Sequence, residues 1–376
     1  MARAEPFRLF FPLAVLLGWV GIGHWVLYWR GITTTYSCLA HGLLQTQSFL
    51  MAFAIGFLLT AVPRRTRSAS ASATEIAIAA ALLVAIAASL AAQLWVAGEL
   101  AYLLLFALLL RFAIVRFVGA SAERRPPAAF VLVPIGILHG VAGSLLVMLG
   151  LSDLAAPAMT TLGALMIQQG VFSCFTVGVG GLVLPLLAGE PPPADLASPR
   201  ERRRAAIYGA AGVAILASFP LEVAGFARIA PLVRAAVIAI GLGVAGGAWR
   251  PPGKPGLHRR LVWISVWMMP LGLALSALFP DYRVPALHVV FIGGFALMSF
   301  GVATHVVLSH LELPELALGR PPAVALLALA LLVALAARLA ADWSHTYFEH
   351  LGWAGVAWIA GTAVWLAFVL PKVLRR

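Results

Sequence analysis

Long apolar runs, each about as long as a membrane is thick, are separated along this chain by short polar connectors. Apolar runs of about 20 residues recur down the whole length, and each is long enough to cross a hydrocarbon core of roughly 30 Å. Short connectors rich in Arg, Pro or Ser separate the runs, as in RRTRSASASAT and GEPPPADLASPRERRR. The short segments of alternating hydrophobicity that build outer-membrane barrels are absent. The pattern therefore predicts an all-α polytopic membrane protein.

Twelve apolar runs can be delimited. The predicted spans are 7–28, 38–62, 74–94, 96–117, 129–150, 157–187, 205–222, 229–249, 259–279, 285–310, 321–341 and 351–372. The first run is too long for a signal peptide and lacks a convincing small-residue cleavage site, so we expect it to be a membrane helix. The connectors show no soluble domain, and residues 1–376 are predicted to form a single integral membrane domain.

The composition agrees with this interpretation. Hydrophobic residues make up 62% and charged residues 11% of the 376 positions, whereas soluble domains have about 45–50% apolar and about 25% charged residues. Burial in a soluble core does not account for that excess. Two cysteines, Cys38 and Cys174, are too few for a disulfide framework.

The basic residues orient the predicted helices. If both termini are cytoplasmic, all but five of the 26 Lys and Arg residues fall in cytoplasmic segments. The exceptions are Arg30, Arg228, Arg234, Arg283 and Arg338. Membrane proteins carry this excess of Lys and Arg on the cytoplasmic side. The bias predicts twelve spans with both termini cytoplasmic, and it explains the net charge of +12 without a nucleic-acid partner.

Two histidines are predicted to lie at one depth on different helices. His41 begins the second span and His288 begins the tenth, both at the outer face. They could face each other as axial ligands of a haem or as part of a copper site, because imidazole suits iron and copper. A histidine within a membrane span is costly unless it is paired or coordinating, which makes such residues functional candidates.

The histidines and Cys38 also have interpretations that involve no bound cofactor. A histidine near the membrane surface can be hydrated or bonded to a carbonyl group, and this is the expectation for His24, His258, His345 and His350. His139 is predicted near mid-membrane, where a helix–helix hydrogen bond would satisfy it. Cys38 shares a helix face with His41 and the two could hold copper or zinc, although a small apolar thiol at a helix start is the simpler reading.

Three stretches of the chain resemble the NnrS family. The segment AHGLLQTQSFLMAFAIGFLLTAVP is similar to the second helix of that family, which opens with His-x-His-Glu and ends in GFLLTAVP. The segment PALHVVFIGGFALMSFGVATHVVLSH is similar to its tenth helix, with Leu-His at the start and Gly-His at the end. GGLVLPLL is a weaker match to a GGR-x-IPFF segment. The order and spacing agree along most of the chain, and the family also has twelve spans.

The resemblance implies a haem- and copper-containing, multi-pass protein of the bacterial inner membrane. The family is linked to nitric oxide metabolism and to resistance against nitrosative stress. His41 matches the first histidine of the opening motif, and His288 and His310 match the two histidines of the tenth helix. The resemblance thus implies cofactor binding at His41, His288 and His310, with metal at His41 and His288.

The chain departs from the family pattern at four polar positions. Leu43 and Leu44 stand where the second histidine and the glutamate of the opening motif fall. Leu182 takes the place of the arginine of the GGR segment, and Trp263 lies near a histidine expected in the ninth helix. A divergent member with one haem, or with no metal, is therefore an alternative to the full metal complement.

Two other functions are alternatives to haem or copper binding in nitric oxide metabolism. A twelve-helix secondary transporter of a small apolar or neutral solute is the main alternative, although such carriers usually place charged groups near the membrane centre. The acidic residues Glu99, Glu222, Asp281 and Asp342 are expected near the outer ends of spans. A redox enzyme akin to the haem–copper oxidases ranks lowest, because the sequence shows no His-His pair. No phosphate loop, nucleophile elbow or Cys-x-x-Cys motif indicates a soluble type of catalysis.

Overall fold

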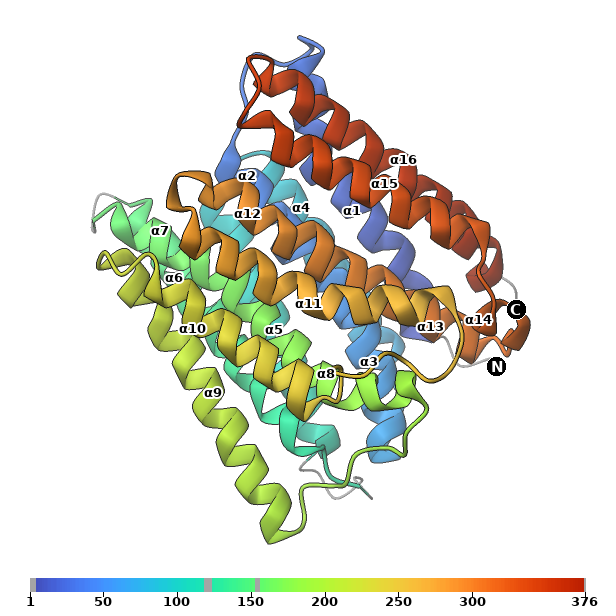
Figure 1. Cartoon of the computed structure of the whole chain (residues 1–376). Helices are drawn as coiled ribbons and strands as arrows, with labels where there is room; N and C mark the ends of the chain where they lie inside the picture. Colours follow the sequence, from blue (N-terminus) through green and yellow to red (C-terminus); the bar gives the residue numbers. More distant parts are fainter. Residues whose placement is uncertain (1–4, 118–123, 153–155, 375–376) are drawn as a thin grey trace.

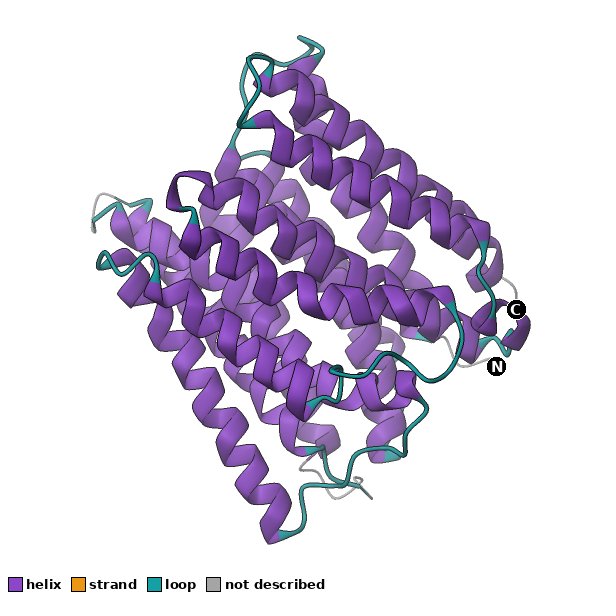
Figure 2. Ribbon diagram, viewed as in Figure 1, coloured by secondary structure: helices purple, strands orange, loops and turns teal. Residues whose placement is uncertain are grey.

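Helices make up nearly the whole of the computed structural model, which describes residues 5–117, 124–152 and 156–374 (Figure 1). The described residues contain no strand (Figure 2). Among them, eleven helices are long and apolar enough to cross a membrane, and a twelfth, Ile229–Gly243, is shorter. The predicted all-α polytopic membrane fold is confirmed.

The α-helices are α1 (Pro6–Trp29), α2 (Cys38–Leu43), α3 (Met51–Thr66), α4 (Ala73–Ala91), α5 (Trp95–Phe117), α6 (Leu132–Gly150), α7 (Ala158–Leu165), α8 (Phe172–Ala188), α9 (Pro199–Val223), α10 (Ile229–Ile238), α11 (Leu257–Leu278), α12 (Arg283–His288), α13 (Leu297–His310), α14 (Pro314–Leu318), α15 (Pro322–Ala341) and α16 (Tyr347–Leu374). The π-helical segments are η1 (Leu44–Leu50), η3 (Met166–Val171), η4 (Ala239–Ala245) and η6 (Val289–Ala296). The 3₁₀ turns are η2 (Ala128–Val131) and η5 (Pro280–Tyr282).

Two predicted span ends move for identifiable reasons. The seventh span was expected to begin at residue 205, but α9 begins at Pro199 because the Ser198 hydroxyl accepts a hydrogen bond from the Glu201 amide at 3.2 Å and caps the helix. The eighth span was expected to reach residue 249. It ends earlier because Gly247 has φ +76, a left-handed conformation that stops a helix.

Three central spans change from α to π geometry part-way along. The segment Cys38–Thr66 contains η1, Ala158–Ala188 contains η3 and Pro280–His310 contains η6. These three are also the most buried of the eleven long spans, at 78%, 67% and 72%. Because π-helical turns are rare and occur mostly at functional sites, they direct attention to the centre of the bundle.

The outer helices α1, α15 and α16 pack together on one side of this centre (Figure 1). Two indole groups form hydrogen bonds between helices: Trp19 of α1 donates to the Thr362 hydroxyl of α16 at 2.8 Å, and Trp365 of α16 donates to the Thr304 hydroxyl of α13 at 2.9 Å. At one end of the bundle the Arg8 side chain donates to the carbonyl of Val373 at 3.1 Å. The first and last helices therefore begin and end on the same side, as an even number of crossings requires.

Candidate functional site

A cavity of about 500 Å³ lies among the central helices, at the end of the bundle where α2 and α12 begin. Small-molecule and cofactor sites usually have about 300–1,000 Å³. Residues from η1, η3 and η6 all line it, including Phe49, Gln168 and Phe291. Trp25 and Trp358 add two further aromatic side chains to its wall. Three π-helical segments thus border this cavity.

His41 and His288 meet in this cavity. The centroids of their imidazole rings are 6.5 Å apart, and the ring planes are nearly parallel, at 12°. Both side chains line the cavity, one from α2 and the other from the end of α12. The predicted juxtaposition of these two residues, which rested on their equal depth, is thus present in the structure.

Each of the two imidazoles is fixed by a backbone carbonyl group. Nδ1 of His41 lies 2.8 Å from the carbonyl oxygen of Gly21, and Nδ1 of His288 lies 2.8 Å from that of Val284. A carbonyl oxygen can only accept, so Nδ1 carries the proton in both rings. Among the described residues no hydrogen bond involves Nε2 of either ring. This is the arrangement of metal-binding histidines, which commonly donate their second ring N–H to a carbonyl group.

Two guanidinium groups also line the cavity. Arg283 forms an ion pair with Glu222, and Arg338 forms one with Asp342. Both arginines are exceptions to the cytoplasmic placement of the basic residues, and the cavity supplies a reason for their position. Each guanidinium has five N–H donors, so donors remain for an anionic ligand beside the existing ion pair.

His24, for which the sequence predicts hydration or a bond to a carbonyl group, is a neighbour of this pair. Its ring centroid lies 5.8 Å from that of His41, and its Nε2 atom is buried without a partner among the described residues. The side chain as a whole is half-buried, and its contact with His41 was not predicted. The position of His24 five residues before the end of the first helix gave no sign of this contact.

His310, the third predicted cofactor residue, lies far from the cavity. It ends α13, and 22 residues of helix separate it from His288, about 33 Å at 1.5 Å per residue. Its Nδ1 is 3.2 Å from the Glu5 carboxylate, and its Nε2 is 3.0 Å from the Arg64 guanidinium. One cofactor cannot contact both His288 and His310.

A second histidine pair forms at that same end of the bundle. Nε2 of His258 lies 3.2 Å from Nδ1 of His305, and the ring centroids are 5.4 Å apart. His258 is fully buried and bonds to another histidine, so the prediction that it is hydrated or bonded to a carbonyl group is wrong; α11 packs against α13 and covers it. The sequence shows no His-His pair, yet packing of distant helices creates two.

The remaining candidates have local partners. His139 is fully buried, and its Nδ1 donates to the Ile135 carbonyl of its own helix at 2.8 Å. The group it meets on another helix is the thiol of Cys174, 3.9 Å away. Cys38 lines the cavity and is exposed, while the Nδ1 atom of its neighbour His41 is engaged by Gly21.

The side chains at the four positions that depart from the family pattern have structural contacts. Leu43, Leu44 and Leu182 are buried in the hydrophobic core. Trp263 donates its indole N–H to the carbonyl of Ala248 at 2.7 Å. In the described part of the chain, no group of three or more His, Cys, Asp or Glu side chains is arranged to hold a metal ion. A site in the cavity would thus take two ligands from the protein.

Two acidic residues expected near the outer ends of spans prove to be buried. Glu99 is fully buried, and the Gln47 amide donates to both of its carboxylate oxygens, at 3.0 and 2.8 Å. Glu222 is 8% exposed and bridges Arg234 and Arg283. The interior near the cavity is therefore more polar than the apolar sequence indicates.

Comparison with known proteins gives one family. The model of the NnrS family, described as NnrS protein, matches residues 2–376, essentially the whole chain. A search of the curated proteins finds no match to this chain.

Proposed function

The chain belongs to the NnrS family, and from this premise we propose that it binds a haem between His41 and His288 and acts in nitric oxide metabolism or nitrosative-stress resistance. Family membership itself supports a membrane protein related to nitric oxide stress. The haem, the ligands and the finer role are the proposal. We place the protein in the bacterial inner membrane, with both termini cytoplasmic and the cavity toward the periplasm.

The geometry of the histidine pair supports the proposal most directly. The ring centroids lie 6.5 Å apart, and a carbonyl group engages Nδ1 of each imidazole, so Nε2 of each would be available to a metal held between them. His41 and His288 would hold a haem without a third ligand from the protein.

The other cavity residues suit the rest of a haem. Its flat ring needs apolar and aromatic walls, which Phe49, Phe291 and Trp358 provide. Its propionates are carboxylates, and Arg283 and Arg338 are placed to pair with such groups. Copper, which the resemblance also implies, would have the same two imidazoles available, and metal analysis separates one haem from an iron–copper combination.

A haem in this cavity would supply one-electron chemistry and, where one of the two imidazoles gives way, a position for nitric oxide, and the residues of the chain do the rest. The Gly21 and Val284 carbonyl groups orient the imidazoles and raise their strength as ligands. Nitric oxide is small, neutral and soluble in lipid, so it needs no polar entrance from the membrane.

Absorption spectra of detergent-purified protein from haem-supplied cells, with iron and copper analysis on the same sample, test the proposal. We expect a Soret band and near-stoichiometric iron in the wild type, and loss of most of the band in His41→Ala and His288→Ala. His345→Ala is the matched control, because His345 is exposed. A colourless, well-folded wild type without iron would overturn haem binding, and full Soret intensity in both variants would overturn the assigned ligands.

A further inference from the structure

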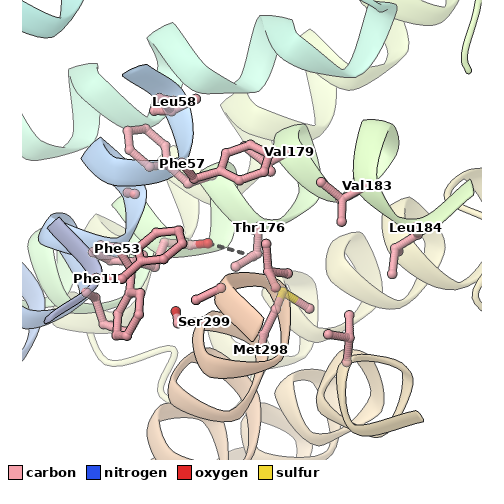
Figure 3. Close-up of a pocket in the computed structure, with 18 residues that line it drawn as sticks. Phe11, Phe53, Phe57, Leu58, Thr176, Val179, Val183, Leu184, Met298 and Ser299 are labelled. Atoms are coloured by element: carbon pink, nitrogen blue, oxygen red, sulfur yellow. Dashed lines mark hydrogen bonds between the residues drawn. The ribbon is translucent and has the colours of Figure 1, made fainter. Parts of the chain in front are cut away.

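A second, smaller pocket of about 80 Å³ lies deeper in the bundle, between α3, α8 and α13 (Figure 3). Phe11, Phe53 and Phe57 reach it from one side, Val179 and Val183 from α8, as the close-up shows. Met298 of α13 reaches it as well. None of the nine histidines lines it. The pocket therefore differs in chemistry from the histidine cavity.

The lining of this pocket offers almost nothing to water. Thr176 and Ser299 are the only polar side chains among the described residues that line it. The Thr176 hydroxyl donates to the Phe172 carbonyl of its own helix at 2.6 Å, so its hydrogen is already used (Figure 3). A buried water molecule needs two to four polar partners, and apolar cavities of this kind stay dry and take up xenon or small apolar molecules.

The two spaces lie in series and share one residue. Leu50, the last residue of η1, lines both the histidine cavity and the apolar pocket and is only 3% exposed. On the opposite wall, Ala296 lines the histidine cavity, and Met298, two residues later, lines the pocket. Leu50 thus separates the two spaces where they adjoin.

We propose that the apolar pocket is a holding site for a neutral diatomic gas, nitric oxide in the cell, which exchanges with the histidine cavity past Leu50. The inference rests on the proposed function for the identity of the gas, but not for the existence of the site. A volume of 80 Å³ is below the range of organic ligand sites and accommodates a diatomic molecule. A gas that leaves the cavity is then retained beside it and does not return at once to the lipid.

Xenon is the probe for the site. Crystals of the full chain, pressurised with xenon, should show an anomalous scattering peak between Phe53 and Met298. The peak should be lost in Ala303→Leu, which places three more carbon atoms in the pocket from a residue that is 1% exposed. Ala54→Val fills less of the pocket and serves if the larger side chain prevents folding. Ala325→Leu, at an exposed position of α15, makes the same change elsewhere and should keep the peak.

The outcomes separate this inference from haem binding. A wild type without xenon in the pocket overturns the holding site, whether or not the protein shows a Soret band. If the haem is present, xenon pressure should increase the fast phase of carbon monoxide recombination after photolysis, because the gas can no longer enter the occupied pocket. Unchanged recombination in crystals or solution where xenon is bound would overturn the exchange past Leu50. A missing Soret band contradicts only the proposed function.

Discussion

At the scale of single residues, Glu222 shows how charge is accommodated inside the bundle. It lies at the end of α9 and bridges Arg234, which is 1% exposed, and Arg283, which lines the histidine cavity. The Ser218 hydroxyl takes another N–H of Arg234 at 3.0 Å, and the ring of Phe219 lies 4.5 Å from that guanidinium. One carboxylate thus holds a structural arginine and a cavity arginine together.

Glu222→Gln should therefore destabilise the protein strongly. The substitution leaves Arg234 buried without its counter-charge, and breaking a buried pair in this way costs about 3–5 kcal/mol. We expect a clear decrease of the thermal unfolding midpoint in detergent, and weaker Soret absorbance through the loss of order at Arg283. Glu349→Gln, at an exposed position of α16, should leave both unchanged. Equal midpoints for Glu222→Gln and the wild type would contradict this account.

The sequence predicted the approach of His41 and His288 because two spans of the same direction begin at the same face, so both histidines lie at one depth. It missed His24 and the His258–His305 pair, since contact also depends on which side of each helix faces which neighbour. That direction is set by packing between helices far apart in the chain. The burial of Glu99 beside Gln47 was missed for the same reason.

At the scale of elements, glycines decide how closely helices approach. Gly143 of α6 faces α7 and η3: a Cβ atom there would lie 2.9 Å from the carbonyl oxygen of Gly163 and 2.7 Å from Ile167 Cγ1. The first of these atoms belongs to the backbone and cannot rotate away. Small residues on facing helices permit this close packing in membranes.

Gly143→Ala should push α6 and α7 apart and lower stability by about 1–3 kcal/mol, the usual cost of overpacking. Gly209→Ala is the control, because a Cβ atom on that glycine of α9 meets nothing within 4 Å. It should be neutral or stabilise the helix by about 0.5–1 kcal/mol. The unfolding midpoints of both variants in detergent provide the comparison, and a Gly143→Ala protein as stable as Gly209→Ala would refute the close contact.

Most helices could be predicted from the sequence, because an apolar run of membrane length has few other structures available. Their ends were less certain, as the Ser198 cap and the turn at Gly247 show. The π-helical segments could not be predicted. The change from α to π geometry leaves the run apolar enough to span a membrane, so the hydrophobic pattern carries no sign of it.

At the scale of the whole molecule, the orientation in the membrane is open to a direct test. The chain has two cysteines, of which Cys38 is exposed and Cys174 is buried. Cys38 begins the helix that carries His41, at the opposite end of that span from Arg64 and Arg65. The distribution of basic residues predicts that the Cys38 end faces the periplasm and both termini face the cytoplasm.

A membrane-impermeant maleimide should thus label Cys38 in intact bacterial cells. In a Cys38→Ser background, Ser70→Cys places a single exposed thiol in the connector after α3, at the other end of the bundle. That variant should react only after the cells are opened. The reverse pattern of labelling would show that the protein is inserted the other way, with the histidine cavity toward the cytoplasm.

The π-helical segments have a consequence for the history of this bundle. An α-helix advances by about 100° per residue, so one residue gained or lost within η1 or η6 turns everything beyond it to another face. Single-residue insertions of this kind leave loops, helix count and membrane orientation as they were. A cavity bordered by η1, η3 and η6 can therefore arise in steps. An ancestral bundle with a fully packed centre can acquire a binding site through separate one-residue insertions. Deletion of the same residues would remove the site again.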